Sequence, residues 1–467
     1  MSASLMSGPL RLGAVSVLAL LLAGCTTLSS DGGFGAVAQT TQERTGLSTR
    51  LLRNDDDRRA LDALLRDKLK QPLSADDAVQ VALLNNRGLQ ATYWSLGVAE
   101  ADLVQAGRLQ NPAFGFKRMH DGESVAIERT LTVNLVNLIT APLASRIEAR
   151  RFEQTRLAVS AAALTVASDT RSAWVEAVAA GQSVAYALQV SEAADASAEL
   201  ANRMQLAGNW SKLDLAREQA FYAETAAELA RARKQANASR EKLTRLMGLW
   251  GEQLHYALPE RLPDLPAAPH ELADVEQTAL RERLDIRAAT LDTQHTASSL
   301  GLTRATRLLN VLELGGVRES GGARGYELTL EIPLFDWGTA RTARAEAVYM
   351  QSVNRLAEAA AHARSEARES YLDYRASYDL ARHYRDNVIP LRRQISDETL
   401  LRYNGMLVSV FELLADAREQ AGAVHAYIGA LKDFWTAQGN LDRALGGTLP
   451  AAPNTNTAKP ANNGDQP

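Results

Sequence analysis

Twice along the chain, a short stretch of alternating apolar and polar residues leads into a very long helical stretch. Residues 326–332 read Y-E-L-T-L-E-I, which places apolar side chains on one face of a strand and polar side chains on the other. Residues 127–135 show the same alternation about two hundred positions earlier, interrupted by Arg129. A strand that leads into a long helix, and does so twice, predicts a duplicated unit.

The duplication can be followed residue by residue. An offset of 197 residues relates Leu131 to Leu328, Trp174 to Tyr371, and Gly208 to Gly405. The alignment slips by about one residue near Ser409. Each repeat therefore consists of a helix, a β-hairpin, a long helix, a tip turn and a second helix, in that order.

The unit boundaries follow from breaks in periodicity and from proline-rich stretches. We expect a signal peptide at 1–24, a lipidated N-terminal tether at 25–72, a first repeat at 73–247, a proline-rich linker at 248–273, a second repeat at 274–446 and a disordered tail at 447–467. Strands are expected at about 113–119, 125–137, 309–318 and 325–334, and long helices at 142–206, opened by Pro142, and at 339–403. Some sixty helical residues span roughly 90 Å, which is too long for a compact domain.

Pro390 lies inside the second long helix, where the first long helix has Ala193. A proline in a helix interior costs about 3 kcal/mol and kinks the axis. We therefore expect the two long helices to bend differently. The alternative is that the helix ends at Val388.

The N-terminus has the pattern of an export signal. Arg11 precedes the apolar run 12–22, which is too short to span a bilayer and ends in L-A-G-C. This ending resembles the bacterial lipobox, which implies that Cys25 is lipidated (a palmitate-bearing lipoprotein) and that Thr26, not being Asp, directs the chain to the outer membrane. The alternative is that this cysteine, the single one in the chain, follows the apolar run by chance.

No later stretch has eighteen consecutive apolar residues, so strands must cross a membrane if the chain crosses one. Strands of about ten residues have the required length, but four strands cannot close a barrel, so several copies would have to share one. The residues expected to face lipid are Ile127, Leu131, Val133, Leu135, Tyr326, Leu328, Leu330 and Ile332. Arg129 falls on the same face and is expected at the membrane interface, where a long charged side chain can reach water. An ordinary antiparallel sheet covering a soluble core is the alternative.

Several segments together resemble the TolC family of outer-membrane efflux channels, in its lipoprotein branch. They are the L-A-G-C ending, the N-P turn at Pro112, the stretch L-E-I-P-L-F-D-W-G-T-A-R, and the tip segments A-G-N-W-S-K-L-D and R-Y-N-G-M-L-V-S-V-F-E-L-L. The similarity covers about residues 70 to 447. It implies a mainly α-helical fold with a membrane β-barrel: a homotrimer with a twelve-stranded barrel, continued by a coiled-coil-like helical tunnel across the periplasm. The implied partners are a periplasmic adaptor (membrane fusion) protein, an inner-membrane pump of the RND type and outer-membrane lipid.

The resemblance also implies roles at the two helix tips. The turns with Gly208, Ser211, Gly405 and Ser409 correspond to the adaptor-docking tips. The acidic residues of the constriction correspond to Glu412, Asp416 and Asp214. Glu412 and Asp416 are four residues apart on one helix, so three copies would form stacked acidic rings. The alternative is that these acids lie on a solvated helix surface.

Motifs for enzymatic chemistry are missing from the sequence. The seven histidines are scattered, and there is no phosphate loop, nucleophile elbow or metal-ligand motif, so we expect no enzyme, no cofactor and no metal site. A net charge of −4 without a basic patch argues against a nucleic-acid partner. The rival functions are a periplasmic adaptor and a structural coiled-coil envelope lipoprotein. The resemblance implies that the pump selects the substrate, so drugs, solvents and metal ions such as copper all stay open.

Overall fold

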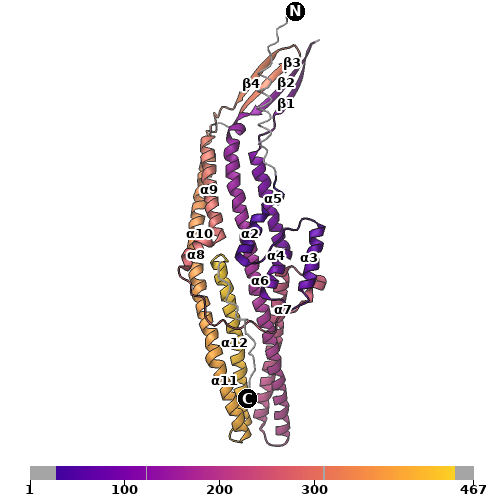
Figure 1. Cartoon of the computed structure of the whole chain (residues 1–467), viewed down its shortest axis with the longest axis vertical. Coiled ribbons are helices and arrows are strands. Elements are labelled where there is room, and N and C mark those ends of the chain that lie inside the picture. Colours follow the sequence, from indigo (N-terminus) through magenta and orange to yellow (C-terminus); the bar gives the residue numbers. More distant parts are fainter. Residues whose placement is uncertain (1–27, 123, 309–310, 448–467) are drawn as a thin grey trace, which may run out of the picture. The chain divides into compact units, whose positions relative to one another are not determined.

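The computed structural model describes residues 28–122, 124–308 and 311–447 (Figure 1). The predicted signal peptide, Cys25 and residues 448–467 of the predicted tail lie outside the described residues. The chain divides into two compact units. Unit 1 contains the chain up to Val37, Thr92–Val159 and Leu284–Ala360, and unit 2 contains Ala38–Ala91, Ser160–Arg283 and the chain from Ala361 on.

Unit 1 contains a β-sheet and helical segments. Its elements are β1 (Ala113–Asp121), β2 (Ser124–Asn134), α9 (Leu284–Ala305), β3 (Leu312–Glu319) and β4 (Arg324–Leu330). The helices α2 (Phe34–Thr45), α5 (Arg87–Gly107), α6 (Leu135–Leu206) and α10 (Thr339–His383) belong partly to unit 1 and partly to unit 2. The remaining elements of unit 2 are α3 (Asp55–Lys68), α4 (Ala75–Asn85), α7 (Lys212–Met247), a 3-10 turn η1 (Gly251–Leu254), α8 (Val275–Glu282), a π-helical turn η2 (Tyr384–Val388), α11 (Ile389–Asn404) and α12 (Val410–Ala444).

The four strands form one antiparallel sheet in the order β1-β2-β3-β4, so β1 and β4 are its edges. The inner pair joins the two repeats, because Leu131 of β2 lies opposite Gly316 of β3. Side chains alternate between the faces of each strand, so the register decides which residues share a face. One face carries Phe114, Phe116, Ile127, Leu131, Val133, Leu312, Leu314, Tyr326, Leu328 and Leu330 together with four arginines. The other face carries Lys117, Glu128, Thr130, Thr132, Asn134, Glu313, Glu327 and Thr329, among others.

Strand β2 ends earlier than the sequence pattern predicts. It ends at Asn134, and Leu135 is the first residue of α6 rather than a strand residue. The cause is a cap, because the Asn134 side-chain oxygen accepts a hydrogen bond from the Asn137 backbone N–H at 2.9 Å. Pro142 therefore lies within α6 and does not begin it.

Strand β4 also ends early, at Leu330. The Glu331 N–H still donates to the Val311 carbonyl at 3.2 Å, but Pro333 has no N–H to continue such bonds. Ile332, which the alternation assigns to the strand, lies in the loop that leads to α10.

The second repeat contains one residue more than the first between the middle of its long helix and the serine that caps the next helix. In the middle of the long helices the repeats match at an offset of 197, as with Trp174 of α6 and Tyr371 of α10. The serines that cap the following helices, Ser211 of α7 and Ser409 of α12, differ by 198. Between these points lies the π-helical turn Tyr384–Val388. A π-turn holds one extra residue within a continuous helix, so it accounts for the change of offset.

Pro390 follows the π-turn directly, at the start of α11. The backbone stays helical through this point, since Ile389 has φ −63° and ψ −45°. The alternative of a helix end at Val388 is therefore wrong. The wider π-turn lies where the proline cannot donate a hydrogen bond and where its ring would crowd an α-helical turn.

Two glycines show that the duplication extends to local contacts. Gly248 follows α7 and Gly446 closely follows α12, both with positive φ (67° and 80°). A Cβ on Gly248 would meet the Asn85 carbonyl oxygen at 2.9 Å, and one on Gly446 would meet the Glu282 carbonyl oxygen at 3.0 Å. In each repeat the end of a tip helix therefore packs against the end of a short helix so closely that only glycine fits.

Unit 2 has the main hydrophobic core, which includes Leu65, Leu73, Val178, Leu243, Met247, Tyr374, Tyr378, Phe434 and Leu441. Buried polar groups in this core bond to backbone. The Trp174 indole N–H donates to the Leu73 carbonyl at 2.8 Å, and at the related position of the second repeat Tyr371 accepts from the Leu272 N–H at 3.4 Å. The proline-rich segment 248–273 belongs to the core as well, since Leu262 and Leu265 are buried.

Candidate functional site

The first helix tip is the turn between α6 and α7. Gly208 has φ +82°, a conformation that glycine adopts without strain. Ser211 caps α7, since its hydroxyl accepts from the Asp214 N–H at 3.2 Å and donates to the Asp214 carboxylate at 2.6 Å. Asp214, a predicted constriction residue, is thus part of a helix cap.

The second tip, between α11 and α12, has the same cap but a different turn. Ser409 accepts from the Glu412 N–H at 3.3 Å, so Glu412 occupies the position that Asp214 has in the first tip. Gly405, however, has φ −80°, and the residue with positive φ is Met406, at 61°. The glycine of the second tip therefore does not supply the positive φ of its turn. The structural counterpart of Gly208 is Met406, at an offset of 198 residues.

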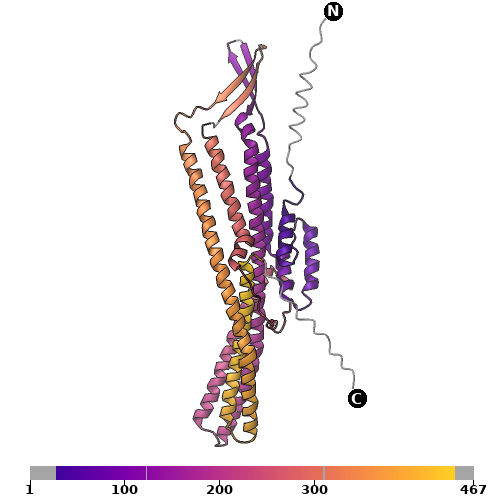
Figure 2. The same ribbon diagram turned by 60° about the vertical axis from the view of Figure 1, so that its left-hand side comes forward.

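Both tip turns lie at the same end of unit 2 (Figure 1, Figure 2) and are joined by an aromatic contact. The rings of Trp210 and Phe411 stack with centroids 4.5 Å apart and planes at 21°. Met406 and Leu407, in contrast, are almost fully exposed (93% and 78%). Apolar side chains that project from a turn into solvent are candidates for contact with another protein.

A charged contact joins the two helical hairpins further along α7 and α12. Arg418 donates to Glu218 at 2.7 Å, and the Ser197 hydroxyl of α6 donates to the other carboxylate oxygen at 2.9 Å. The Glu218 side chain is only 3% exposed, and the Arg418 guanidinium lies 4.0 Å from the centroid of the Phe221 ring. We call Ser197, Glu218, Phe221 and Arg418 the tip latch. The latch could not be predicted from the sequence, because Glu218 and Arg418 are two hundred residues apart and each has the spacing of an ordinary surface charge.

The two acids expected on one helical face differ in environment. Glu412 is exposed, whereas Asp416 is buried, and one of its carboxylate oxygens has no hydrogen-bond partner among the described residues. A buried carboxylate oxygen without a partner is costly. The role of Glu412, Asp416 and Asp214 at a constriction stays a prediction.

The residues of unit 1 that the structure describes leave both faces of the sheet largely exposed. On its apolar face Leu131, Val133, Leu328 and Leu330 are exposed, and Tyr326 is exposed to 85%. Ile127 is half-buried. The polar face is open as well, with Glu327 and Thr329 exposed. An exposed apolar face is a candidate for contact with a membrane or with another protein.

The loop after β4 extends the apolar surface. Phe335 is completely exposed, and Ile332, Leu334 and Trp337 are more than half exposed. The loop ends at Gly338, whose φ is +71° and where a Cβ would meet the Arg307 carbonyl oxygen at 2.7 Å. The exposed aromatic residues were not selected from the sequence, although L-F-D-W-G lies in the stretch that carries the resemblance.

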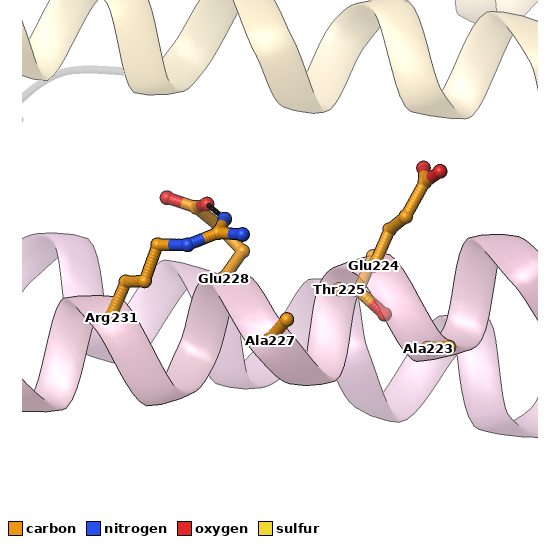
Figure 3. A pocket seen from close by; sticks show the side chains of 6 residues that line it. All are labelled: Ala223, Glu224, Thr225, Ala227, Glu228 and Arg231. Atoms are coloured by element: carbon orange, nitrogen blue, oxygen red, sulfur yellow. Dashed lines mark hydrogen bonds and ion pairs between the residues drawn. The ribbon is translucent and has the colours of Figure 1, made fainter.

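An open groove of about 580 Å³ lies along α7 (Figure 3). Ala223 and Ala227 line it, Glu224 projects from α7, and Glu228 and Arg231 pair at 2.6 Å. The groove brings together no combination of side chains that suits a reaction.

Within the described ranges, no three His, Cys, Asp or Glu side chains lie close enough together to hold a metal ion. None of the helices that the structure describes combines the length and apolar character needed to cross a lipid bilayer.

Comparison with known proteins shows what the fold is. No protein-family model and no curated protein sequence matches the chain. Solved structures do match. The outer-membrane channel OprN is 19% identical with a TM-score of 0.68, and the match covers 82% of this chain and 92% of OprN. The CmeC outer membrane channel of Campylobacter jejuni is 17% identical with a TM-score of 0.66, covering 80% and 85% of the two chains. CusC, a protein described in terms of transmembrane channel formation, is 17% identical with a TM-score of 0.66, covering 80% and 92%.

The chain therefore has the fold of outer-membrane channels. The resemblance to TolC-like channels that the sequence predicts is confirmed at the level of the fold.

Proposed function

We propose that the chain is one subunit of an outer-membrane exit duct for a tripartite efflux system. In this proposal three copies join their sheets into a twelve-stranded barrel, and their helices form a tunnel in the periplasm. The duct is passive, opens at its helix tips on contact with an adaptor and an inner-membrane pump of the RND type, and releases small toxic compounds or metal ions.

The observation that carries the proposal is the exposed sheet with one apolar face, one polar face and two open edges. The apolar face suits lipid and the polar face suits a water-filled lumen. The edges β1 and β4 leave backbone N–H and C=O groups unpaired, which lipid does not tolerate. Pairing β1 of one copy with β4 of the next removes both edges. A sheet that only covered a soluble core would have one buried face, and here neither face is buried.

The two faces can be tested with adjacent substitutions in β4. Leu328→Arg places a charge on the apolar face, where arginine in the middle of a bilayer costs about 2–4 kcal/mol per copy. Thr329→Arg places the same charge on the polar face. We expect Leu328→Arg to abolish recovery of the assembled protein from outer membranes and Thr329→Arg to be tolerated. Equal recovery of the two variants would contradict the proposal.

The assembly itself is tested by the protein mass of the detergent-extracted particle, measured by light scattering. Three chains per particle support the shared barrel. One chain per particle in a mild detergent favours the rival functions, a periplasmic adaptor or a structural coiled-coil envelope lipoprotein.

For the tips we propose adaptor docking and gating. The exposed Met406 and Leu407 beside the capped helix starts at Ser211 and Ser409 support docking. The acids Asp214, Glu412 and Asp416 are proposed to line the constriction, where like charges from three copies repel each other. The double substitution Glu412→Gln and Asp416→Asn should increase leakage of small solutes through the resting channel, and unchanged permeability would exclude the pair from the gate.

The anchoring proposal concerns Cys25, which lies outside the described residues. We propose that its lipid holds the N-terminal tether at the outer membrane. Mass spectrometry of the mature N-terminal peptide tests this, because a processed chain that begins with an unmodified residue would contradict it.

A further inference from the structure

The apolar face of the sheet carries four arginines near the hairpin turns. Arg129 of β2 lies opposite Arg318 of β3, and Arg318 lies opposite Arg324 of β4. These three form a single row across three neighbouring strands. Arg118 of β1 lies opposite Ile127 on the same face, one step nearer the turns. We call these four residues the arginine row. All four are exposed.

The register at this place is well defined. Beyond the last strand pair, the Ser320 N–H donates to the Ile127 carbonyl at 2.8 Å, and the Ile127 N–H donates to the Ser320 hydroxyl at 3.1 Å. A slip by one residue would move every side chain to the opposite face. The two bonds oppose such a slip, so the alignment of the arginines is a property of the fold.

No strand glutamate that the structure describes lies on the same face as these charges. The glutamates of the strands, Glu128, Glu313, Glu319 and Glu327, all lie on the polar face by the alternation of side chains. None of the four arginines forms an ion pair with another residue that the structure describes. Like charges directly opposite each other destabilise a sheet, so the row is suited to binding anions from outside the chain.

The position of the row along the strands identifies where these anions are. From Arg324 to Leu330 there are six residue steps, roughly 20 Å of strand, and this stretch carries only apolar side chains on the same face. Exposed Ile332, Leu334 and Phe335 extend the apolar surface beyond β4. An apolar band with aromatic residues at one border and arginines at the other matches a bilayer between its two polar surfaces.

We propose that the arginine row binds the phosphate groups of lipid headgroups in the leaflet on the side of the hairpin turns. This inference rests on the proposed function, because it requires that the sheet enters a membrane. Guanidinium groups bind phosphate through two parallel hydrogen bonds, and long arginine side chains reach the headgroups from a strand whose neighbours lie in hydrocarbon. In a trimer the rows of three copies form a belt of twelve arginines around the barrel.

The test uses the full-length protein and a lipid probe whose phosphates can be removed. Lipid A, a phosphorylated glycolipid, and the same glycolipid without phosphate differ only in the groups that the row should bind. Native mass spectrometry of the detergent-extracted protein gives the ratio of their binding constants. We expect the wild type to prefer the phosphorylated form about tenfold or more, and the variant Arg129→Gln, Arg318→Gln, Arg324→Gln to lose this preference.

Control variants separate the row from general charge effects. Lys117→Gln removes a charge from the polar face at the same end of the sheet and should leave the preference unchanged. Arg129→Lys, Arg318→Lys, Arg324→Lys keeps the charge without the paired geometry and should retain part of it. The inference is overturned if the triple glutamine variant keeps the wild-type preference, or if inorganic phosphate at millimolar concentration displaces the lipid.

Failure of the proposed function gives a different result. If the wild-type protein does not float with bilayers on a density gradient, the sheet is not in the membrane and the proposed function fails. If the protein floats with bilayers but does not distinguish the two lipids, only the arginine row is affected. The triple glutamine variant should float as the wild type does, since its substitutions remove charge from the apolar face.

Discussion

Loss of the arginine from the tip latch should loosen the contact between the two helical hairpins. In Arg418→Leu, the Glu218 carboxylate keeps its bond from Ser197 but loses its charged partner. It is only 3% exposed, so water cannot readily replace the guanidinium. The expected result is more frequent local opening of α12 where it packs against α7.

The size of the effect follows from the contacts. A hydrogen bond to a charged group contributes about 1.5–3 kcal/mol, and a partly exposed cation over an aromatic ring adds about 0.5–1 kcal/mol. Because Arg418 is 33% exposed, we expect the coupling between Glu218 and Arg418 at about 2 kcal/mol, below the value for a fully buried pair. This corresponds to about a thirtyfold change in the equilibrium for local opening.

Hydrogen exchange of backbone amides in α12, measured on the full-length protein in detergent, reports this equilibrium. A double-mutant cycle of Glu218→Gln and Arg418→Leu isolates the coupling. The control is the pair Glu199–Arg203, which has a similar distance of 2.8 Å but side chains that are 56% and 73% exposed. We expect its coupling to be about 0.3–0.5 kcal/mol. Equal coupling in the two cycles would refute the reasoning, because burial would then not decide the strength of the latch.

Three further predictions concern unit 2. Gly248→Ala should lower the thermal unfolding midpoint, because the new methyl group meets a backbone carbonyl at 2.9 Å in a conformation with positive φ; an unchanged midpoint would show that the two helix ends can separate freely. The Lys68 ammonium holds the pKa of Asp77 below its ordinary value of 3.8, with the cap residue Ser74 adding to the effect, so the contribution of this carboxylate to stability is present above about pH 4 and decreases as the pH falls below it. Asp77→Asn should therefore reduce the loss of stability on acidification, as measured by unfolding at pH 6 and pH 3, and an identical loss in the variant would contradict the assignment. Deleting Asn387 of the π-turn together with Pro390→Ala should convert the π-turn to plain α-helix and preserve assembly. Deleting one residue of α10 instead should prevent assembly, because it turns the tip by about 100°.

The strands and caps could be predicted from the sequence because their determinants are local. Alternation with a period of two fixes which side chains share a face, and the S-x-x-D and S-x-x-E spacings identify Ser211 and Ser409 as caps. The predicted ends of β2 and β4 were wrong because single residues determine where these strands end. The side-chain amide of Asn134 caps the following helix, and Pro333 has no backbone N–H.

The tip latch and the second tip turn depend on distant or ambiguous information. Which residue of α12 faces Glu218 depends on the packing of helices two hundred residues apart, and no spacing in the sequence reports it. At the second tip the residue with positive φ is Met406, directly after Gly405. Because glycine usually takes that conformation, the sequence favours Gly405 for it, which is the adjacent residue.

The π-helical turn at Tyr384–Val388 records how the two halves of the chain diverged. After an ancestral duplication, gain of one residue in the second half, or its loss from the first, would have rotated the whole tip relative to its partner had the helix stayed purely α-helical. Because the π-turn holds the extra residue, the capping serines Ser211 and Ser409 and the helix-end glycines Gly248 and Gly446 keep equivalent positions. A long helix of this kind can thus change its length by a single residue during evolution without a compensating change at the tip. π-Helical turns in the long helices of related chains would mark where this has happened.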